Sequence, residues 1–484
     1  MIKQLTNLFR HSSIYTISTF VQRALGLVLL PVYTDTAYMS KTAYGDLSLA
    51  YTFIAFSTII YLYGMDLAFM RYFFLGEYKR QDIYRTAFGS ILISSLVISA
   101  VLLISSSQIS IVVFGEGDYS LFIMLAAGVL FFDSLANLPY LILRAEEKSA
   151  AYSAIRIGRF LLEVCLNIFF VIYLRQGVIG ILYANVIASF INFLSLLPFQ
   201  FKYMKGVFSL AVLKSMLKFA LPMVPNGLAY LTVEVSDKYL MRLLLDKDTL
   251  GLYAPNYKFG SIFLMIVIAF RTAWQPFFLK IAKEEKEPKG IYIKVMTYFV
   301  LIGTLVVTAG SYFIEYIVQI PLYGDKTLMG SAYWSGVKII PVIMTAYLFY
   351  GIYVNLTVGI YIRKKAQLMV IFTGLAALVN VGSNLYLMPA FGMLGAAAAT
   401  FLAYFVMAGS ILIANRKIYP VDYEYGRISV CLAYLAVMLF ILYFFEPDFA
   451  QRLIMVIFSP LIFVFSGFFQ KKEIEVLRGY LRRK

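Results

Sequence analysis

The chain has 484 residues, of which 61% are hydrophobic and only 14% are charged, and its mean hydropathy is +0.80. A soluble protein carries about 25% charged residues, so this composition excludes an ordinary soluble domain. The apolar residues form runs of about twenty, the length of a membrane-spanning helix. The pattern of short alternating strands that builds a membrane barrel is missing from the sequence. The chain is therefore predicted to be an all-α polytopic membrane protein.

The apolar runs, taken in chain order, predict about fourteen membrane spans. The first run follows Lys3 and Arg10 without a small-residue cleavage site, so we expect it to remain as a helix rather than to be removed as a signal peptide. The spans are expected at residues 12–33, 44–68, 86–107, 119–143, 152–174, 178–199, 214–236, 250–278, 291–314, 333–361, 366–387, 393–414, 428–445 and 452–469.

The loops between these spans divide by charge, and this accounts for the net charge of +16. Loops on the side of the N-terminus hold most of the 42 Lys and Arg residues, whereas the opposite loops hold only Lys41, Arg175, Lys238, Arg242, Lys247, Lys326 and Arg452. Cytoplasmic loops are the ones enriched in Lys and Arg. We therefore expect both termini in the cytoplasm, with the basic loops facing an anionic membrane surface rather than nucleic acid.

Few residues are suited to disulfide or metal chemistry. The two cysteines, Cys165 and Cys431, lie inside apolar runs, and His11 is the single histidine. This composition argues against a disulfide framework and a soft-metal site. The sequence contains no ATP-binding P-loop, G-x-x-x-x-G-K-[ST], and no loop long enough for a soluble catalytic domain. We expect no cofactor, no metal and no enzymatic activity.

Two pairs of stretches indicate an internal repeat. RQGVIGILYANVIASF (175–190) and AFGMLGAAAATFLAYF (390–405) both open with Gly-x-x-Gly before a helix of small residues. Earlier, TAYGDLSLAYTF (42–53) resembles TLGLYAPNYKF (249–259), again with a matching glycine. Shared small residues can reflect helix packing alone, but both pairs fall at corresponding helix positions, which favours a repeat.

The repeat predicts two six-helix lobes in parallel orientation, followed by two appended helices. Such halves, related by an axis along the membrane normal, build many transporters, and substrate binds between them. The expected divisions are 1–200 for the first lobe, 201–415 for the second, and 416–484 for the last two helices and a basic tail.

Charged residues also occur within or at the edges of the spans, where they are costly and usually face a bundle interior or a watery pathway. The acidic ones are Asp66, Asp133, Glu163, Glu234, Asp237 and Glu315, and the basic ones are Arg23, Arg71, Arg156, Arg159, Lys258, Arg271 and Lys338. Arg71 and Lys338 lie near span ends, where we expect them to snorkel. We hold Asp66, Asp133, Glu163, Glu234, Asp237 and the adjacent Lys238 as candidates for coupling or gating.

Structural pairing competes with a coupling role for the charges of the first lobe. Arg159 and Glu163 are four residues apart on one helix face, a spacing that allows them to neutralise each other. Asp133, in the middle of its span, is expected to pair with Arg156 or Arg159 of the next span. Both uses are typical of buried membrane charges.

Arg23, Lys258 and Arg271 lack such an explanation. Arg23 lies mid-span with no acid in its own span, and Lys258 and Arg271 are both on the eighth span. All three can face a cleft between the lobes, and a cationic cleft suggests an anionic substrate. Phosphate groups are the leading candidate, because guanidinium groups match their oxygens.

The stretch VSDKYLMRLLLDKDTLGLYAPNYKFGSIF (235–263), followed by FRTAWQPFF (270–278), resembles the second-half signature of Wzx-type polysaccharide flippases. The matching residues are Asp237, Lys238, Tyr239, Gly251, Tyr253, Trp274 and Pro276. AYGDLS (43–48), after a first span that ends near Pro31, is similar to the N-terminal pattern of the same family, which belongs to the multidrug/oligosaccharidyl-lipid/polysaccharide (MOP) superfamily.

The resemblance implies a two-lobed fold with a central cationic cavity in a bacterial or archaeal plasma membrane. It also implies alternating access that moves a polyprenyl-diphosphate-linked oligosaccharide to the outer leaflet, driven by a coupling ion, H+ or Na+. Implied partners are membrane lipids and the polysaccharide polymerase and chain-length machinery. The alternative function is ion-coupled multidrug antiport within the same superfamily, although cationic drugs would favour an acidic cleft.

Overall fold

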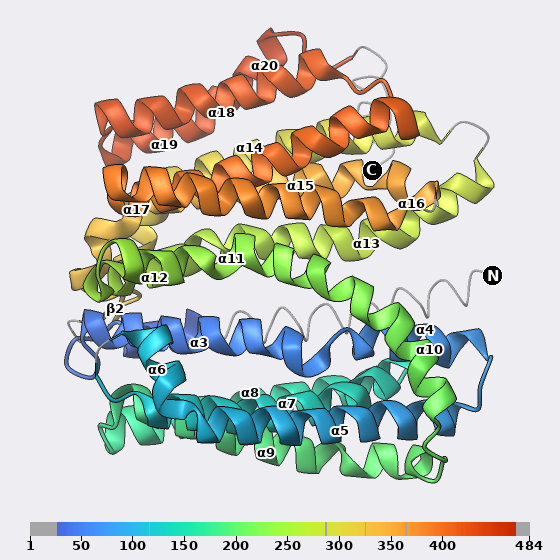
Figure 1. Ribbon diagram of the computed structural model, residues 1–484. Coiled ribbons are helices and arrows are strands. Elements are labelled where there is room, and N and C mark those ends of the chain that lie inside the picture. Colours follow the sequence, from blue (N-terminus) through green and yellow to red (C-terminus); the bar gives the residue numbers. More distant parts are fainter. Residues whose placement is uncertain (1–26, 116, 286–287, 325, 364, 471–484) are drawn as a thin grey trace.

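The computed structural model describes residues 27–115, 117–285, 288–324, 326–363 and 365–470. The helices of this part of the chain lie side by side in two bundles (Figure 1). The predicted all-α polytopic membrane fold is therefore confirmed. Residues 12–26 of the first expected span, Arg23 among them, lie outside the described residues, whereas its last part, 27–33, is described.

The N-bundle, drawn in blue, teal and, for its last helix, green in Figure 1, contains the helices before the connection that includes residues 210–220. Helix α3 begins after Ser40, whose side chain accepts a hydrogen bond from the amide of Ala43 and so caps the helix. The elements are α2 (Leu30–Tyr33), α3 (Lys41–Leu62), α4 (Met65–Leu75), α5 (Arg80–Ile104), α6 (Ser106–Phe114), α7 (Ser120–Ala145), α8 (Ser149–Asn167), the π-helical η1 (Ile168–Tyr173) and α9 (Gly177–Met204).

The expected span 44–68 is divided into α3 and α4. Tyr63 and Gly64 both have positive φ, 33° and 76°, which ends one helix and starts the next. A Cβ at Gly64 would lie 2.6 Å from the carbonyl oxygen of Ala220, so only glycine fits between α4 and the chain that crosses it. The break therefore creates a docking point for the connection between the bundles.

That connection starts with α10 (Leu210–Ala220), which lies against α4 and α5 of the N-bundle (Figure 1). The hydroxyl of Tyr72 donates to the carbonyl of Ser215 over 3.1 Å, and the amide of Ser209 donates to the Thr86 hydroxyl over 3.0 Å. A short 3₁₀ segment, η2 (Leu221–Met223), then leads into the second bundle.

The C-bundle follows, drawn in green to orange. It contains α11 (Val224–Leu244), α12 (Lys247–Gly260), α13 (Ile262–Glu284), α14 (Lys289–Val318), the antiparallel pair β1 (Pro321–Tyr323) and β2 (Lys326–Thr327), η3 (Ser331–Ile339), α15 (Ile340–Leu356), α16 (Val358–Ile362), η4 (Ala366–Leu368) and α17 (Met369–Ile418). The expected eighth span is two helices, α12 and α13, which meet at Ser261.

Two further helices pack on the outer side of the C-bundle, as expected for appended spans: α18 (Tyr425–Phe445) and a broken one, α19 (Phe449–Phe458), η5 (Ser459–Leu461) and α20 (Ile462–Phe465). Arg452 of α19 is buried and bonds Glu315 of α14 over 2.6 Å. Lys338 pairs with Glu446 over 2.9 Å. Glu315 and Lys338 therefore attach the appended helices to the C-bundle.

Nine helices of the described chain are long and apolar enough to cross a membrane, of which the 50-residue α17 covers two expected spans. Helices α8 and α11 fall short because they carry the ionisable residues discussed below. Two ends can be distinguished: a basic end, where loops 76–79, 145–148 and 205–209 lie, and a hairpin end, where β1–β2 lies.

Both Gly-x-x-Gly stretches make the same turn. Gly177 and Gly392 have φ values of 55° and 57°. Three residues later, a Cβ at Gly180 would lie 3.2 Å from the carbonyl oxygen of Phe170, and a Cβ at Gly395 would lie 2.1 Å from that of Leu387. Each stretch thus reverses the chain so tightly that the next helix begins against the end of the previous one, and α17 contains two helices rather than one.

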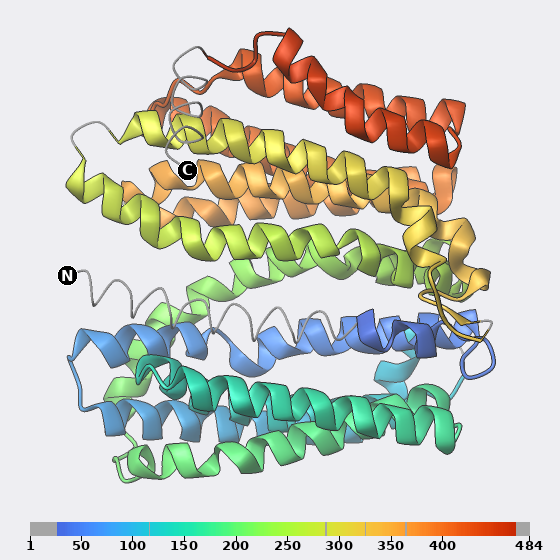
Figure 2. The same cartoon turned by 180° about the vertical axis from the view of Figure 1, so that it is seen from behind.

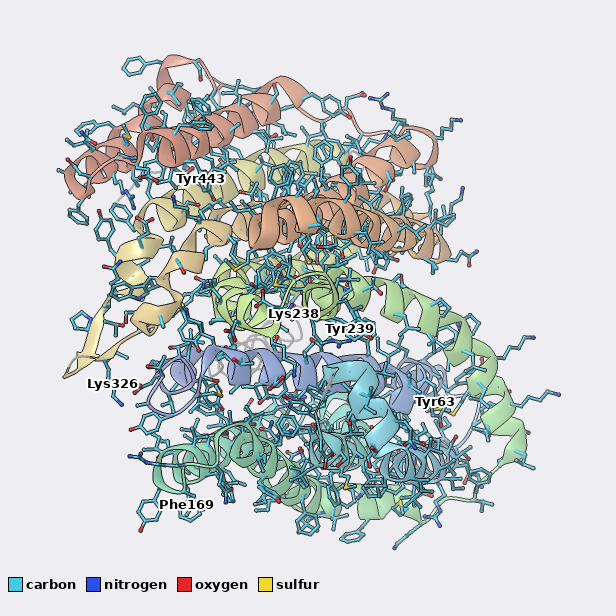
Figure 3. All side chains as sticks on the ribbon, turned by 60° about the vertical axis from the view of Figure 1, so that its left-hand side comes forward. Tyr63, Phe169, Lys238, Tyr239, Lys326 and Tyr443 are labelled. Carbon is cyan, nitrogen blue, oxygen red and sulfur yellow. The ribbon has the colours of Figure 1, made fainter. Side chains whose placement is uncertain are left out.

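The bundles meet at the hairpin end. The ion pairs there are Lys247 with Asp46, 2.8 Å, and Lys326 with Asp35, 2.6 Å. In Figure 2 the strands lie beside the blue part of the N-bundle, and Figure 3 places Lys326 at their tip. Each of these pairs joins a residue of one bundle to a residue of the other.

Candidate functional site

A cavity of about 310 Å³ lies between the two bundles, and we call it the central cavity. The N-bundle lines it mainly with the first half of α3, and the C-bundle lines it with α11, α12, α13 and α15. Its lining residues are Tyr33, Tyr44, Leu47, Ser48, Tyr51, Thr52, Glu234, Val235, Lys238, Ala254, Tyr257, Lys258, Ser261, Leu264 and Tyr347. Three of the candidate residues, Lys258, Glu234 and Lys238, are therefore brought together here.

Lys258 lines this cavity from α12 without an ion pair to any described carboxylate. Its electrostatic partner is Glu163 of α8, in the other bundle, beyond ion-pair distance. Glu163 also interacts with Arg159 on its own helix, so its charge is shared between two cations. Lys258 thus retains hydrogen-bonding capacity toward an anion in the cavity.

Glu234 of α11 is held by tyrosines of the C-bundle. Tyr404 and Tyr347 donate hydroxyl hydrogen bonds to its two carboxylate oxygens. The hydroxyls of Tyr347 and Tyr257 are also 2.9 Å apart. The ammonium of Lys238 lies 4.0 Å from the centroid of the Tyr257 ring and bonds the Glu234 carbonyl oxygen over 3.1 Å. Figure 3 shows Lys238 on the side of α11 that faces the N-bundle.

Asp237 lies one turn further along α11 and is fully buried. It accepts a hydrogen bond of 2.6 Å from Tyr253 and an ion pair of 3.3 Å from Lys238. Nearby, Ser236 donates to Asn380, and Asn380 accepts a second bond from Asn384. The side-chain oxygen of Asn384 and the side-chain nitrogen of Asn380 are buried without a partner, so this polar cluster has unused bonding capacity.

The charges of the N-bundle form a separate cluster. Asp133 of α7 binds Arg159 of α8 in a bidentate manner, over 2.8 and 2.9 Å, and Arg159 also donates to Ser189 over 3.0 Å. Arg156 stacks instead on Tyr140, with its guanidinium carbon 4.4 Å from the ring centroid. Of the two partners predicted for Asp133, the structure selects Arg159.

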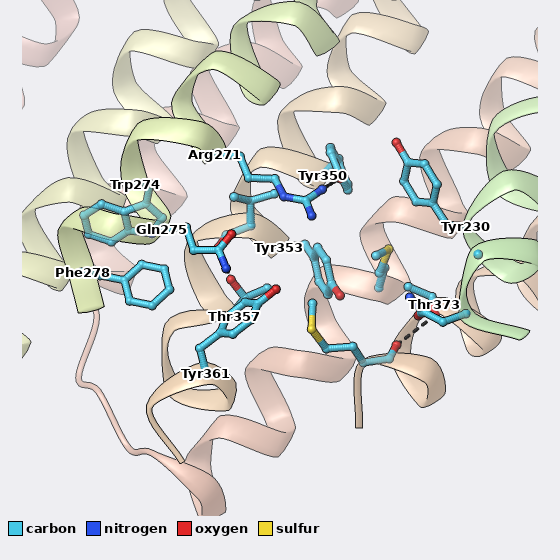
Figure 4. A pocket seen from close by; sticks show the side chains of 15 residues that line it. Tyr230, Arg271, Trp274, Gln275, Phe278, Tyr350, Tyr353, Thr357, Tyr361 and Thr373 are labelled. Atoms are coloured by element: carbon cyan, nitrogen blue, oxygen red, sulfur yellow. Dashed lines mark hydrogen bonds between the residues drawn. The ribbon is translucent and has the colours of Figure 1, made fainter. Parts of the chain in front are cut away.

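Arg271 of α13 borders a second cavity, of about 220 Å³, inside the C-bundle toward the basic end (Figure 4). We call it the tyrosine pocket. It is lined by Asn226, Gly227, Tyr230, Arg271, Trp274, Gln275, Phe278, Tyr350, Tyr353, Val354, Thr357, Tyr361, Met369, Thr373 and Met407. The guanidinium of Arg271 donates to the Tyr350 hydroxyl over 3.1 Å. The cationic residues Lys258 and Arg271 therefore belong to two different cavities.

Asp66 lies in the first turn of α4, after the break at Gly64, and lines neither cavity. The structure places the other candidates in three groups: Lys258, Glu234 and Lys238 at the central cavity, Asp237 beside them, and Asp133 with Glu163 in the N-bundle.

Among the tyrosines of these sites, the sequence analysis missed Tyr347, Tyr353, Tyr361 and Tyr404. Tyr347, Tyr350 and Tyr353 are spaced three residues apart on α15, and Tyr361 follows one turn beyond Thr357. Residues three or four apart share one face of a helix, so this spacing predicts a tyrosine stripe. Tyr404 had no such signal, because its partner Glu234 is 170 residues away.

Comparisons with known proteins address the family. The family model described as "Polysaccharide biosynthesis protein" matches residues 38–329. No curated protein matches the chain. The structure resembles that of "Lipid II flippase MurJ, inward closed conformation", with a TM-score of 0.75 and 16% identity over 93% of this chain and 97% of that chain.

Two other similar structures are transporters of the MOP superfamily. A multidrug resistance MATE family transporter in an inward-facing conformation has a TM-score of 0.67 and 15% identity, over 85% of this chain and 96% of that chain. A transporter from Pyrococcus furiosus, described as having a binding pocket of reverse polarity, has a TM-score of 0.56 and 14% identity, over 88% of this chain and 96% of that chain.

At such low identities the structural likenesses show the fold alone, and it is the fold of MOP superfamily flippases and transporters. The family model covers more than half of the chain and extends from α3 to the segment after β2. The resemblance stated from the sequence is confirmed: the chain belongs to the polysaccharide biosynthesis protein family.

Proposed function

We propose that the protein is a flippase that moves a polyprenyl-diphosphate-linked oligosaccharide from the cytoplasmic to the outer leaflet by alternating access. The proposed location is a bacterial or archaeal plasma membrane, with both termini in the cytoplasm. The product would feed cell-surface polysaccharide synthesis, with the polymerase and chain-length machinery as partners. The family and the fold support a transported lipid-linked sugar, and the charges of the cavities support an anionic one.

This proposal rests on the positions of Lys258 and Arg271 and on their lack of a carboxylate partner. Each borders a cavity, and neither forms an ion pair with a carboxylate of the described chain. Lys258 is half-buried, and Arg271 is exposed to the open space that it borders. A charge within a membrane span is costly unless a cavity or a ligand accommodates it, and a ligand here would supply the missing negative charge. A diphosphate offers several oxygens for charge-assisted hydrogen bonds. Arg23 is proposed to contribute to the same binding.

Ion coupling is proposed at the C-bundle acids. Glu234 faces the central cavity, and Asp237 is buried one turn away, so a proton or Na+ that binds these carboxylates changes the charge beside the substrate. Lys238 contacts both residues and would transmit that change. Asp66, Asp133 and Glu163 remain proposals for gating.

Multidrug antiport is the second candidate, and Glu234 is the residue that favours it, because an acid at the central cavity attracts a cation. Two tyrosine hydroxyls already satisfy this carboxylate, and Lys258 lies in the same lining. An organic cation would therefore meet a positive charge in the cavity that it must enter.

The test follows lipid-linked oligosaccharide in cells that depend on this chain for export, using a membrane-impermeant sugar oxidant to report the outer leaflet. Losing one charge-assisted contact is expected to lower export about tenfold or more in Lys258→Gln and in Arg23→Ala. Lys258→Arg and Arg23→Lys should restore part of it. Lys280→Gln, which removes a charge at the surface of α13, is the matched control. Normal export by Lys258→Gln, together with dye efflux that Glu234→Gln abolishes, would overturn the proposal in favour of antiport.

A further inference from the structure

The tyrosine pocket has the composition of a sugar-binding site, and the binding of a diphosphate by Lys258 in the central cavity leaves it unused. It lies inside the C-bundle, between α11, α13, α15 and α17, rather than between the bundles. Its volume of about 220 Å³ is below the range of about 300–1,000 Å³ for whole drug-sized ligands. A cavity of this size accommodates one unit of a larger molecule.

Two polar groups in its lining have no partner. Trp274 and Tyr353 are each only 4% exposed, and the indole N–H of the first and the hydroxyl of the second make no hydrogen bond. Buried polar groups are normally satisfied, and leaving one unpaired costs about 1–3 kcal/mol. Both groups can donate, so acceptor oxygens of a ligand that reaches them after a shift of the lining side chains would satisfy them.

The charge of the pocket is positive. Arg271 is its one ionisable cation, and no Asp or Glu is found among its lining residues. The electrostatic partners of the guanidinium are the hydroxyls of Tyr350, Tyr361 and Tyr230, all uncharged phenols. In Figure 4 the guanidinium points to Tyr350 at the edge of the hollow, with Gln275 and Tyr353 beside it. An anionic group placed here would meet a free guanidinium edge.

The pocket also has an entrance. A wider hollow of about 700 Å³ adjoins it and shares Tyr230, Arg271, Gln275 and Tyr350 with its lining. Arg271 therefore stands at the boundary between the two spaces, where it can contact a group that projects inward from the larger one. Aromatic rings supply flat apolar faces for a pyranose, and the hydroxyl and amide groups supply its polar partners.

We propose that the tyrosine pocket binds one anionic sugar unit of the transported oligosaccharide, whose charge is a carboxylate on the ring or a phosphate attached to it. Arg271 would bind the charge, and Trp274 and Tyr353 would donate to ring oxygens. This inference rests on the proposed function for the source of the sugar. It adds a second subsite, separate from Lys258, that selects for acidic saccharides.

The chain contains a direct reporter of this pocket. It has only two tryptophans, Trp274 in the pocket and Trp334 in η3. In a Trp334→Phe background, the tryptophan fluorescence of the purified protein, excited selectively over that of tyrosine, comes from Trp274 alone. Titration with glucuronate, glucose 1-phosphate, glucose and inorganic phosphate separates the need for a ring from the need for a charge, and tells carboxylate from phosphate.

We expect a saturable fluorescence change with glucuronate or with glucose 1-phosphate, and about tenfold or more weaker binding of glucose and of inorganic phosphate. Arg271→Gln should abolish the response, Arg271→Lys should restore part of it, and Lys280→Gln should not alter it. Tyr353→Phe should weaken binding without lowering the melting temperature, because its hydroxyl has no protein partner to lose.

The inference fails if neither anionic sugar changes the Trp274 signal, if glucose binds as well as they do, or if Arg271→Gln binds normally. These measurements need no transport. A chain that exports lipid-linked sugar but fails here retains its proposed function and loses only this subsite. A chain that binds anionic sugar but exports no lipid-linked oligosaccharide retains the subsite and loses the function.

Discussion

Gly45 of α3 and Gly251 of α12 pack against each other at the hairpin end, where a Cβ on Gly45 would lie 3.4 Å from the backbone nitrogen of Gly251. The contact is reciprocal. That same Cβ would lie 2.4 Å from the carbonyl oxygen of Lys247, and a Cβ on Gly251 would lie 1.9 Å from that of Lys41. The two stretches aligned as a repeat thus meet each other across the interface between the bundles.

Gly251→Ala should therefore loosen the hairpin end, because the added methyl group overlaps backbone that cannot rotate away. We expect a cysteine introduced as Ser48→Cys at the central cavity, in a Cys165→Ala background, to react several-fold faster with an impermeant thiol reagent added outside. Gly409→Ala is the matched control, since a Cβ there meets open space. Equal labelling rates in both variants would show that this contact does not limit access.

The Asp133–Arg159 pair should behave as one unit in stability. Removing either partner leaves the other charge uncompensated, so Asp133→Asn and Arg159→Gln should each lower the melting temperature in detergent. The double variant should be less destabilised than the sum of the two, with a coupling energy of about 0.5–3 kcal/mol. Strictly additive effects would mean that the bidentate contact contributes nothing to stability, and that its role is confined to transport.

Glu146, in the loop after α7, provides a pH-dependent contact at the basic end. Partial burial raises its pKa, but hydrogen bonds from Lys148, Tyr203 and Lys202 outweigh this and bring the pKa down to about 2. The pKa of Glu in an unfolded chain is about 4.3. The ionised carboxylate therefore stabilises the fold fully above that pH, and this stabilisation is lost as the pH falls toward 2.

The melting temperature of Glu146→Gln should therefore lie below that of the wild type at pH 7, and the difference should shrink steadily below about pH 4. Glu77→Gln, in the neighbouring loop with an exposed side chain, is the control. A difference that stays constant from neutral to acidic pH would contradict the assignment of these bonds to the ionised carboxylate.

Glu234→Gln should separate binding from energy coupling. The amide oxygen can still accept from one of the two hydroxyls, of Tyr347 or Tyr404, and the amide nitrogen can donate to the other. The side chain no longer titrates or neutralises a cation. We expect counterflow of substrate across proteoliposomes to persist, while accumulation driven by an imposed H+ or Na+ gradient falls about tenfold or more. Asp237→Asn, measured beside it, identifies which carboxylate senses the ion. Gradient-driven transport that survives both substitutions would remove the C-bundle acids from coupling.

The sequence predicts the helices well because a bilayer demands about twenty apolar residues per span, and little else satisfies the backbone there. The breaks within the helices are harder to predict from the sequence. Gly64 looks like any helix glycine in the sequence, and its role depends on Ala220, which lies 156 positions later. Hydropathy is also low on α8, α11 and α12, since the residues that form the candidate sites are polar.

The individual cations and acids could be found from the sequence, because a charge inside a span is conspicuous. Their distribution between the cavities could not be predicted from the sequence. Lys258 and Arg271 belong to one expected span, yet the end of α12 at Ser261 and the packing of α15 place them in separate cavities. Only the tyrosine spacing on α15 carries a local signal, and the hydrogen-bond partners of Tyr347 and Tyr350 come from other helices.

The docking of α10 on the N-bundle has a mechanical meaning. From Ser209 to Ala220 the connection moves with α4 and α5, so only Leu221–Met223 and the adjoining Pro225 remain between the two bodies. So short a joint keeps the basic end of α11 tethered to the N-bundle at nearly fixed separation. The hairpin end has no covalent tether between the bundles in the described chain; ion pairs, two apposed glycines and hydrogen bonds, such as that from the amide of Gly330 to the Thr34 hydroxyl, join them there. The bundles are thus covalently linked near one side of the membrane, and on the other side they can separate by breaking non-covalent contacts.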